Sequence, residues 1–430
     1  MNHIVIIGNG ISGITTARHI RKRSDYKITV ISSETEHFYS RTALMYIYMG
    51  HMKYEHTKPY EDWFWKKNRI KLVFDHVARI DFNEKILSTQ KGESITYDKL
   101  VIATGSKPNK FGWPGQELNG VQGLYSKQDL DLMEEKSAGL KRAVIVGGGL
   151  IGIEMAEMFH SRNIPVTFLV REKSFWGKVL PAEESKMINR HIYENHIDLR
   201  LGEELNEIID DGNGNVAGVI TKSGEKIDCG FVGLTVGVSP NIDFVKNTEL
   251  EIDRGILINE QQETNIKDVY SVGDCAQHRN PPAGRRPLEQ IWYTGKIQGE
   301  NCAKNICGQD STYDPGIFYN SAKFFDIEYQ IYGEVPVPLP EGISSVYWEH
   351  ENRKQAIRVV FKTESRAVIG FHLMGIRYRH EVCDKWIREK APIDKVIKKL
   401  KKANFDPEFH KRYEKEVLKV FKSQFETTLA

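Results

Sequence analysis

A glycine-rich turn between a short apolar strand and a helix constrains the fold of this 430-residue chain more than any other feature, and it occurs twice. The first copy runs Gly8-Asn9-Gly10-Ile11-Ser12-Gly13, between the apolar run 4–7 and a helical stretch at 14–20. Gly8 makes the tight bend, Gly10 lets the backbone approach a pyrophosphate, and Gly13 lets the helix pack closely on the strand. Residues 28–31 read as the next buried strand. We therefore predict a βαβ unit whose helix N-terminus holds the phosphates of a dinucleotide.

The second copy begins about 139 residues later and has the same flanks. Residues 143–146 form an apolar run that enters Gly147-Gly148-Gly149-Leu150-Ile151-Gly152-Ile153-Glu154. A helix is predicted to about Ser161, followed by a strand at 166–170. Two turns with correct flanks are poorly explained as coincidence, so we expect two bound nucleotides.

Composition limits the remaining possibilities. A chain of 430 residues exceeds one hydrophobic core, and the 40% hydrophobic and 27% charged residues are ordinary for a globular protein. No stretch approaches the 18 apolar residues of a membrane span, and we expect no signal peptide because a core strand is predicted directly after Met1. A net charge of +2 argues against nucleic acid as a general partner. The five cysteines show no C-x-x-C spacing, which favours a reducing compartment and a cytoplasmic location.

Further candidate sites follow the predicted strands. Glu34, just past the second strand, is the candidate ligand of a nucleotide ribose, and the alternative is a solvated loop glutamate. Short strands are predicted at 70–74 and 85–88, and Asp210 to Asn215 reads as a hairpin turn rather than a calcium loop. Three more strands end in turns, which carry Ala103-Thr104-Gly105, Gly237-Val238-Ser239-Pro240-Asn241 and Gly273-Asp274. A helix from Ile291-Trp292 to Ile306 comes next, then strands with polar alternation from Ile317 and a lysine-rich helical tail.

These motifs, in this order over residues 1 to about 310, resemble the pyridine nucleotide–disulfide oxidoreductase superfamily of flavoprotein reductases. The resemblance implies an α/β fold with two Rossmann-like domains, the second inserted in the first, and a smaller α+β C-terminal domain. The expected boundaries are 1–112 with 245–315 for FAD, 113–244 for NAD(P)H, and 316–430 for the C-terminal domain.

The resemblance also assigns roles to residues. Asp274 would bond the flavin ribityl chain, and the helix that starts near Ile291 and Trp292 would point its N-terminus at the isoalloxazine ring. The expected cofactor-binding residues are Gly8, Gly10, Ile11, Ser12, Gly13, Glu34, Arg41, Ala103, Thr104, Gly105, Gly147, Gly149, Leu150, Ile151, Gly152, Arg171, Gly237, Gly273, Asp274, Ile291 and Trp292.

The chain departs from the family in two places. No cysteine precedes Cys229, so a relay from flavin to a disulfide is excluded. Tyr39-Ser40-Arg41 and Leu44 look like the segment of ferredoxin- and nitrite-reductase-like members, but Tyr46 stands where many of these carry a lysine that pairs with Glu154. We expect desolvation to raise the pKa of the unpaired Glu154, and either Tyr46 bonds it or another cation enters. The expected catalytic residues are Glu154, Tyr46 and Arg41.

The end of the second unit's strand bears on the choice of nicotinamide. An NAD site usually has an acidic residue at the position that Val170 occupies in this chain. The next residue is Arg171, and NADP-dependent members of the family have an arginine at this point. Glu172 offers a competing ribose partner. The sequence thus favours NADPH over NADH.

Other reactive residues are assigned structural roles. Cys275, Cys302 and Cys307 are predicted to be small core residues, because five-residue spacing does not align the last two on one helix face. His380 and Cys383, near His372, lack further ligands, so no metal is expected.

Residues 385–422 hold 13 Lys or Arg against 6 Asp or Glu, with the densest run at 398–402. This run is either a solvated helix face or a docking patch for a small acidic electron-transfer protein. We expect an FAD-dependent NAD(P)H oxidoreductase that feeds an external carrier such as a ferredoxin or rubredoxin. The alternatives are an oxidase, a reductase of quinones or other small molecules, and a redox-sensing flavoprotein. The oligomeric state stays open.

Overall fold

The computed structural model describes residues 2–406, 408 and 411–425. The chain separates into two compact units. Unit 1 comprises Met1–Gly112, Gln116–Leu140 and Gly233–Pro315, and unit 2 comprises Trp113–Gly115, Lys141–Val232 and Gly316–Ala430. The domain boundaries predicted from the motifs divide the chain differently, and they stay a prediction. In the part of the chain that is described, no helix is long and apolar enough to cross a membrane.

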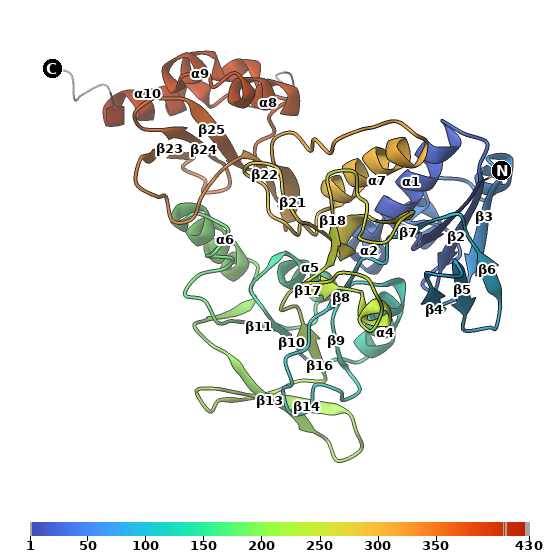
Figure 1. Cartoon of the computed structure of the whole chain (residues 1–430). Helices are drawn as coiled ribbons and strands as arrows, with labels where there is room; N and C mark the ends of the chain where they lie inside the picture. Colours follow the sequence, from blue (N-terminus) through green and yellow to red (C-terminus); the bar gives the residue numbers. More distant parts are fainter. Residues whose placement is uncertain (1, 407, 409–410, 426–430) are drawn as a thin grey trace. The chain divides into compact units, whose positions relative to one another are not determined.

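Unit 1 is built on a five-stranded parallel sheet in the order β19-β7-β1-β2-β3. Strands β1 (His3–Ile7) and β2 (Lys27–Ser32) are joined through α1 (Ile11–Arg21), as the first glycine turn predicts. Ile4 to Ile7 are buried, as expected of a central parallel strand with covered faces. Helix α1 packs along α7 (Trp292–Ile306), which is distant from it in the sequence (Figure 1).

Unit 1 also contains the following strands and helices. The sheet is completed by β3 (Ile70–Phe74), β7 (Lys99–Ile102) and β19 (Val269–Ser271). Two short helices, α2 (Leu44–Tyr48) and α3 (Trp63–Lys67), are followed by the longer helix α4 (Lys127–Ser137). The small strands are β4 (Val77–Asp81), β5 (Ile86–Thr89), β6 (Ser94–Thr96), β8 (Ser106–Pro108), β9 (Val121–Gln122), β17 (Val238–Pro240), β18 (Ile256–Ile258) and β20 (Ala276–His278).

Unit 2 repeats the βαβ arrangement. Strands β10 (Ala143–Val146) and β11 (Val166–Val170) are parallel and are joined through α5 (Leu150–Ser161). Strand β12 (Asp198–Leu201) lies beside β11, and β16 (Phe231–Leu234) lies beside β10. Helix α6 (Ala182–Glu194) precedes β12, and an antiparallel sheet is formed by β13 (Leu205–Asp210), β14 (Val216–Thr221) and β15 (Lys226–Asp228). The turn between β13 and β14 is the predicted hairpin at Asp210 to Asn215.

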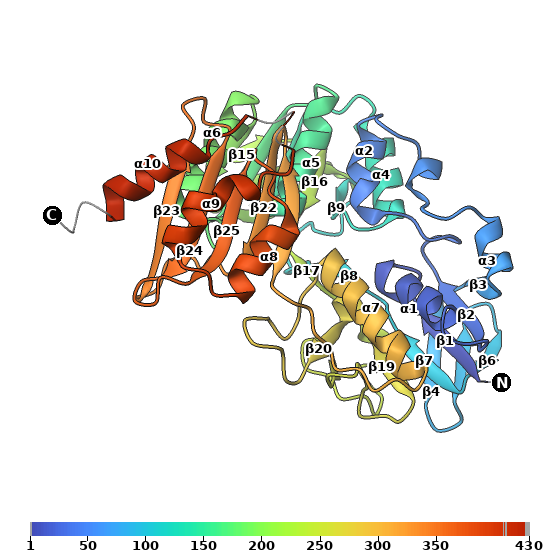
Figure 2. The same cartoon turned by 90° about the horizontal axis from the view of Figure 1, so that it is seen from above.

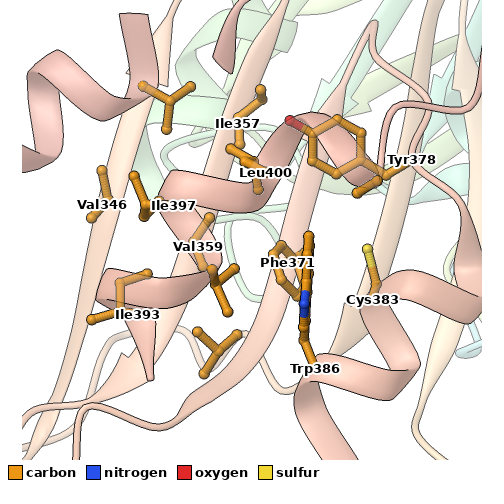
Figure 3. Close-up of a cluster of buried hydrophobic side chains, with 14 of the residues drawn as sticks. Val346, Ile357, Val359, Phe371, Tyr378, Cys383, Trp386, Ile393, Ile397 and Leu400 are labelled. Carbon is orange, nitrogen blue, oxygen red and sulfur yellow. The ribbon is translucent and has the colours of Figure 1, made fainter. Parts of the chain in front are cut away.

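The C-terminal part of unit 2 is an antiparallel five-stranded sheet in the order β21-β22-β25-β24-β23. Its strands are β21 (Tyr319–Phe324), β22 (Ile327–Gly333), β23 (Ile343–Glu349), β24 (Ala356–Lys362) and β25 (Val368–Met374). Helices α8 (His380–Arg388), α9 (Ile393–Lys399) and α10 (Glu414–Phe425) cover one face (Figure 2). Between them lies a core that includes Val359, Phe371, Trp386 and Ile397 (Figure 3).

Candidate cofactor sites

The first glycine turn leaves room for a ligand where the sequence predicts a pyrophosphate. Gly8 has φ +110°, and a Cβ there would lie 2.1 Å from the carbonyl oxygen of Ala103. A Cβ at Gly13 would lie 2.1 Å from the oxygen of Gly8, whereas one at Gly10 would meet no atom within 4 Å. Gly8 and Gly13 thus serve packing, and Gly10 borders open space. Helix α1 starts beside that space with no side-chain cap, so its first N–H groups can receive an anion.

The turns after β7 and β19 lie against this glycine turn. Parallel pairing of β19 with β7 and of β7 with β1 brings the ends of the three strands to one edge of the sheet. Gly273 has φ +80°, and a Cβ there would lie 2.3 Å from Oγ of Ser12. The Gly273 N–H donates to Oε1 of Gln298 on α7 at 2.6 Å. The predicted Ala-Thr-Gly and Gly-Asp turns therefore belong to one site with the first glycine turn.

Asp274 is a partly buried carboxylate with few hydrogen-bond donors around it. Ser106 Oγ donates to its carboxylate at 3.2 Å, and Gln290 Nε2 in turn donates to Ser106 Oγ at 2.7 Å. Among the described residues, no cation forms an ion pair with it, and burial raises its pKa to about 6. Part of its surface is still accessible. Ser106 and Tyr125 are its side-chain hydrogen-bond partners, and its accessible part could accept further hydrogen bonds from ribityl hydroxyls.

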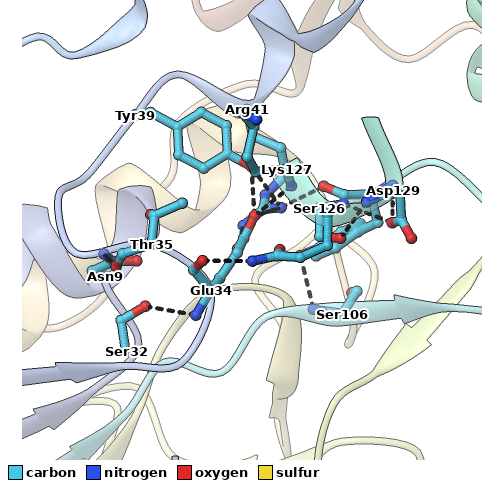
Figure 4. A network of polar contacts seen from close by, with 12 residues as sticks. Asn9, Ser32, Glu34, Thr35, Tyr39, Arg41, Ser106, Ser126, Lys127 and Asp129 are labelled. Atoms are coloured by element: carbon cyan, nitrogen blue, oxygen red, sulfur yellow. Dashed lines mark hydrogen bonds and ion pairs between the residues drawn. The ribbon is translucent and has the colours of Figure 1, made fainter. Parts of the chain in front are cut away.

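The carboxylate of Glu34 is bound by hydrogen bonds and an ion pair from other residues of the protein (Figure 4). Its Oε1 accepts from Tyr39 Oη at 2.5 Å, from Arg41 at 2.9 Å and from the N–H of Lys127 at 3.0 Å. Arg41 also bonds Oε2 of Glu34 and the carbonyl oxygen of Tyr125. Burial alone would raise the pKa of Glu34, but Arg41 and Tyr39 hold it below its ordinary value.

This network gives Glu34 and Arg41 a structural role that the sequence did not indicate: they fasten the start of α4 to the loop after β2. Their predicted roles against FAD remain predictions.

The second glycine turn also borders open space. A Cβ at Gly149 would meet nothing within 4 Å, whereas one at Gly148 would lie 2.5 Å from Cγ1 of Val170. Gly147 has φ +113°. Helix α5 starts at Leu150 with no side-chain cap, so its first N–H groups can bind a second pyrophosphate.

The end of β11 presents two cations around one carboxylate. Arg171 Nε donates to Oε1 of Glu172 at 2.9 Å, and Lys178 Nζ lies 3.4 Å from the same oxygen. The Arg171 and Lys178 side chains are 64% and 72% exposed, whereas that of Glu172 is 24% exposed. Burial would raise the pKa of Glu172, but Arg171 keeps it lowered. Both cations are exposed to solvent, and each lies beside the Glu172 carboxylate.

Glu154, on the first turns of α5, has the raised proton affinity that the sequence predicts. Burial raises its pKa to about 7, and the carboxylate of Glu157 adds to the rise. Glu154 keeps some accessible surface. A carboxyl group with a pKa near 7 can hold or release a proton under physiological conditions.

Comparison with known proteins decides the family. Residues 2–294 match the model of the family described as pyridine nucleotide-disulphide oxidoreductase. The chain belongs to this family. It is an oxidoreductase, and FAD and a nicotinamide dinucleotide are the cofactors of its class.

Relatives within the oxidoreductase family align over different shares of their length. NADH-rubredoxin oxidoreductase of Clostridium acetobutylicum is 29% identical over 385 residues, 88% of this chain and 94% of that protein. Its solved structure has a TM-score of 0.73 at 25% identity and covers 93% of this chain and 99% of that one. An NADH oxidase of Methanocaldococcus jannaschii is 30% identical over 397 residues, covering 86% and 87%. Nitrite reductase [NAD(P)H] of Bacillus subtilis is 27% identical over 331 residues, 76% of this chain, and the chain spans only 40% of its length.

The remaining predicted residues of this oxidoreductase lie as follows. Tyr46 lies on α2 of unit 1 and stacks on His51, with ring centroids 6.0 Å apart, whereas Glu154 belongs to unit 2. Their pairing remains a prediction. Helix α7 starts at Trp292 after Ile291, as predicted, and the Trp292 side chain is 37% exposed. Gly237, with φ +93°, leads into β17.

The cysteines are free, and four of them are buried, as predicted for core residues; Cys307 is partly buried. Within the described ranges, no three His, Cys, Asp or Glu side chains gather to hold a metal. His372 lies on β25, whereas His380 and Cys383 lie on α8.

Several residues around these sites were not found from the sequence. Tyr125 and Lys127 bond the Arg41–Glu34 pair, Gln298 holds the Gly-Asp turn, and Glu157 lies beside Glu154. Only Glu157 carried a local signal, because a residue three positions after Glu154 shares its helix face.

Proposed function

We propose that this oxidoreductase takes a hydride from NADPH onto FAD and passes the electrons to a small acidic iron–sulfur carrier such as a ferredoxin or rubredoxin. The observation that carries the proposal is a group of five exposed lysines on α9 and the turn after it. Among the described residues, none of the five forms an ion pair. The group, called the lysine patch below, consists of Lys395, Lys398, Lys399, Lys401 and Lys402. Unpaired surface cations attract and orient an acidic partner.

Residues around the two glycine turns would bind the two cofactors. The first N–H groups of α1 would hold the FAD pyrophosphate, and Asp274 would accept hydrogen bonds from the ribityl hydroxyls. The first N–H groups of α5 would hold the pyrophosphate of the nicotinamide nucleotide. Bound FAD would supply hydride acceptance and release of electrons one at a time. Glu154 would take up the accompanying proton at its carboxylate.

The choice of NADPH over NADH is supported by Arg171 and Lys178 at the end of β11, where Val170 stands in place of an acid. A cytoplasmic location is supported by five free cysteines.

An NADH oxidase is the second candidate, because a relative of that name is 30% identical over 86% of this chain. An oxidase would pass both electrons to oxygen and would need no protein partner.

A reoxidation experiment separates these candidates. The purified protein, loaded with FAD, should be yellow and should bleach when NADPH is added without oxygen. The reduced protein is then mixed with oxygen, a quinone, a ferredoxin or a rubredoxin, and return of the yellow colour is timed. Rapid return with an iron–sulfur carrier and slow return with oxygen supports the proposal. Rapid return with oxygen alone supports the oxidase, and slow return with every acceptor supports a redox sensor.

A further inference from the structure

The C-terminal part of unit 2 places one lysine beside the glutamates of the nucleotide-binding helix. Glu154 and Glu157 lie three residues apart on α5 and therefore on one face. Lys323, on β21, has its Nζ 3.7 Å from Oε1 of Glu157. The other oxygen of Glu157, Oε2, accepts from the N–H of Phe325 at 3.1 Å. The hairpin β21–β22 therefore holds Glu157 by one ion pair and one backbone hydrogen bond.

The hairpin is fixed on α5 by more than these polar contacts. Phe325 occupies the turn with φ +54° and packs edge-on against the rings of His160 and His191, with centroids 6.1 and 5.6 Å away. The neighbouring Asp326 accepts a hydrogen bond from Lys354 Nζ at 2.8 Å, and its other carboxylate oxygen lies 2.5 Å from Nε2 of His191. Lys323 is thus presented to α5 by an anchored turn.

Few other charges of unit 2 face the two glutamates. Strands β10 and β11, which pack on α5, carry no titratable side chains, and β21 contributes Lys323. His160 lies one turn further along α5, and Asp326 is paired with Lys354 and lies next to the His191 ring. Burial raises the pKa of Glu157, and Lys323 opposes that rise.

We propose that Lys323 is a positioning residue for the proton at Glu154: by neutralising Glu157, it keeps the neighbouring Glu154 carboxyl able to ionise and to accept a proton during turnover. This inference rests on the proposed function, because it requires Glu154 to lie at the redox site. A hydride carries two electrons and one proton. When two one-electron carriers each take an electron, one proton is left, which Glu154 accepts and then gives up to water.

The sign of the effect follows from the charges. Without Lys323, the Glu157 carboxylate is uncompensated, and a second negative charge on Glu154 becomes less favourable. In Lys323→Met, we expect the midpoint of Glu154 titration to rise by about half a unit, below the one to three units of a direct contact, since Lys323 acts through Glu157. In Glu157→Gln, whose amide oxygen can still accept from Phe325, the midpoint should fall. In the double variant, the effect of Lys323→Met should disappear.

The test follows the carboxyl carbon of Glu154 by NMR against pH in protein labelled with ¹³C at glutamate, both without and with FAD, and assigns it through Glu154→Gln. Lys226→Met is the matched control, because it removes a lysine of the same unit that pairs with an exposed aspartate, Asp228, at 3.4 Å. The pH profile of electron delivery should move with the NMR midpoint.

Opposite shifts in the two single variants, with no shift in the control, support the inference. An unchanged midpoint in Lys323→Met, or equal shifts in Lys323→Met and Lys226→Met, overturns it. If Lys323→Met does not fold, an unchanged midpoint in Glu157→Gln overturns it equally. If the midpoints shift as expected but the pH profile of electron delivery does not follow them, the charge coupling stands and the role of Glu154 in the proposed function fails.

Discussion

Asp274 is the single residue on which the FAD site depends most directly, because its carboxylate meets few donors from its own chain. A charge-assisted hydrogen bond to a ribityl hydroxyl contributes about 1.5–3 kcal/mol. Asp274→Ala should therefore weaken FAD binding about 10- to 100-fold. The measurement is titration of FAD-free protein with FAD, followed by flavin fluorescence.

The same residue gives FAD binding a pH dependence. Burial raises the pKa of Asp274 to about 6, and the ionised form is the better acceptor, so wild-type affinity should fall as the pH drops below about 6. Asp274→Ala should lose this dependence. Asp228→Ala, which removes an aspartate that is 82% exposed on β15, should leave FAD binding unchanged. Equal FAD affinity in Asp274→Ala and wild type would remove Asp274 from the site.

Among the elements, the end of β11 sets the choice of nicotinamide. Arg171 is more than half exposed, so solvent weakens its pull on a 2′-phosphate. We expect Arg171→Ala to raise the KM for NADPH about tenfold, or ~1.4 kcal/mol, and to leave that for NADH nearly unchanged. Glu172→Gln, which releases Arg171 and Lys178, should lower the KM for NADPH. The control is Arg200→Ala on the neighbouring β12, and equal changes for both nucleotides in Arg171→Ala would contradict the assignment.

The elements also show what a sequence can and cannot predict here. Each βαβ unit was predictable because strand, glycine turn and helix are contiguous, and α7 was found at its predicted bounds, Trp292–Ile306. The partners of Glu34 were not predictable, because Lys127 lies 93 residues away and only the folded chain brings them together. Likewise, Lys323 reaches Glu157 from another sheet. For residues after 376, the helical pattern was visible, but the sheet face that buries Trp386 and Ile397 was not.

At the scale of the whole molecule, the lysine patch is a local excess of charge on a chain whose net charge is only +2. If it docks an acidic carrier, reversal of Lys398, Lys399, Lys401 and Lys402 to Glu should slow electron delivery severalfold or more at low salt. Flavin reduction by NADPH should not change, because it uses other residues. Wild-type delivery should also slow with salt, since the Debye length falls from about 30 Å at 0.01 M to about 8 Å at 0.15 M.

The control for this prediction must change the charge equally at another place. Lys22, Lys66, Lys67 and Lys71 are exposed on unit 1, and their reversal to Glu alters the net charge by the same amount. If docking uses the patch, the control should retain most of the delivery rate, because the orienting charges near the patch are intact. Equal slowing in both variants would show a general effect of net charge. A rate indifferent to salt and to reversal of the patch would make the patch a solvated helix face, and the oxidase would then be the better candidate.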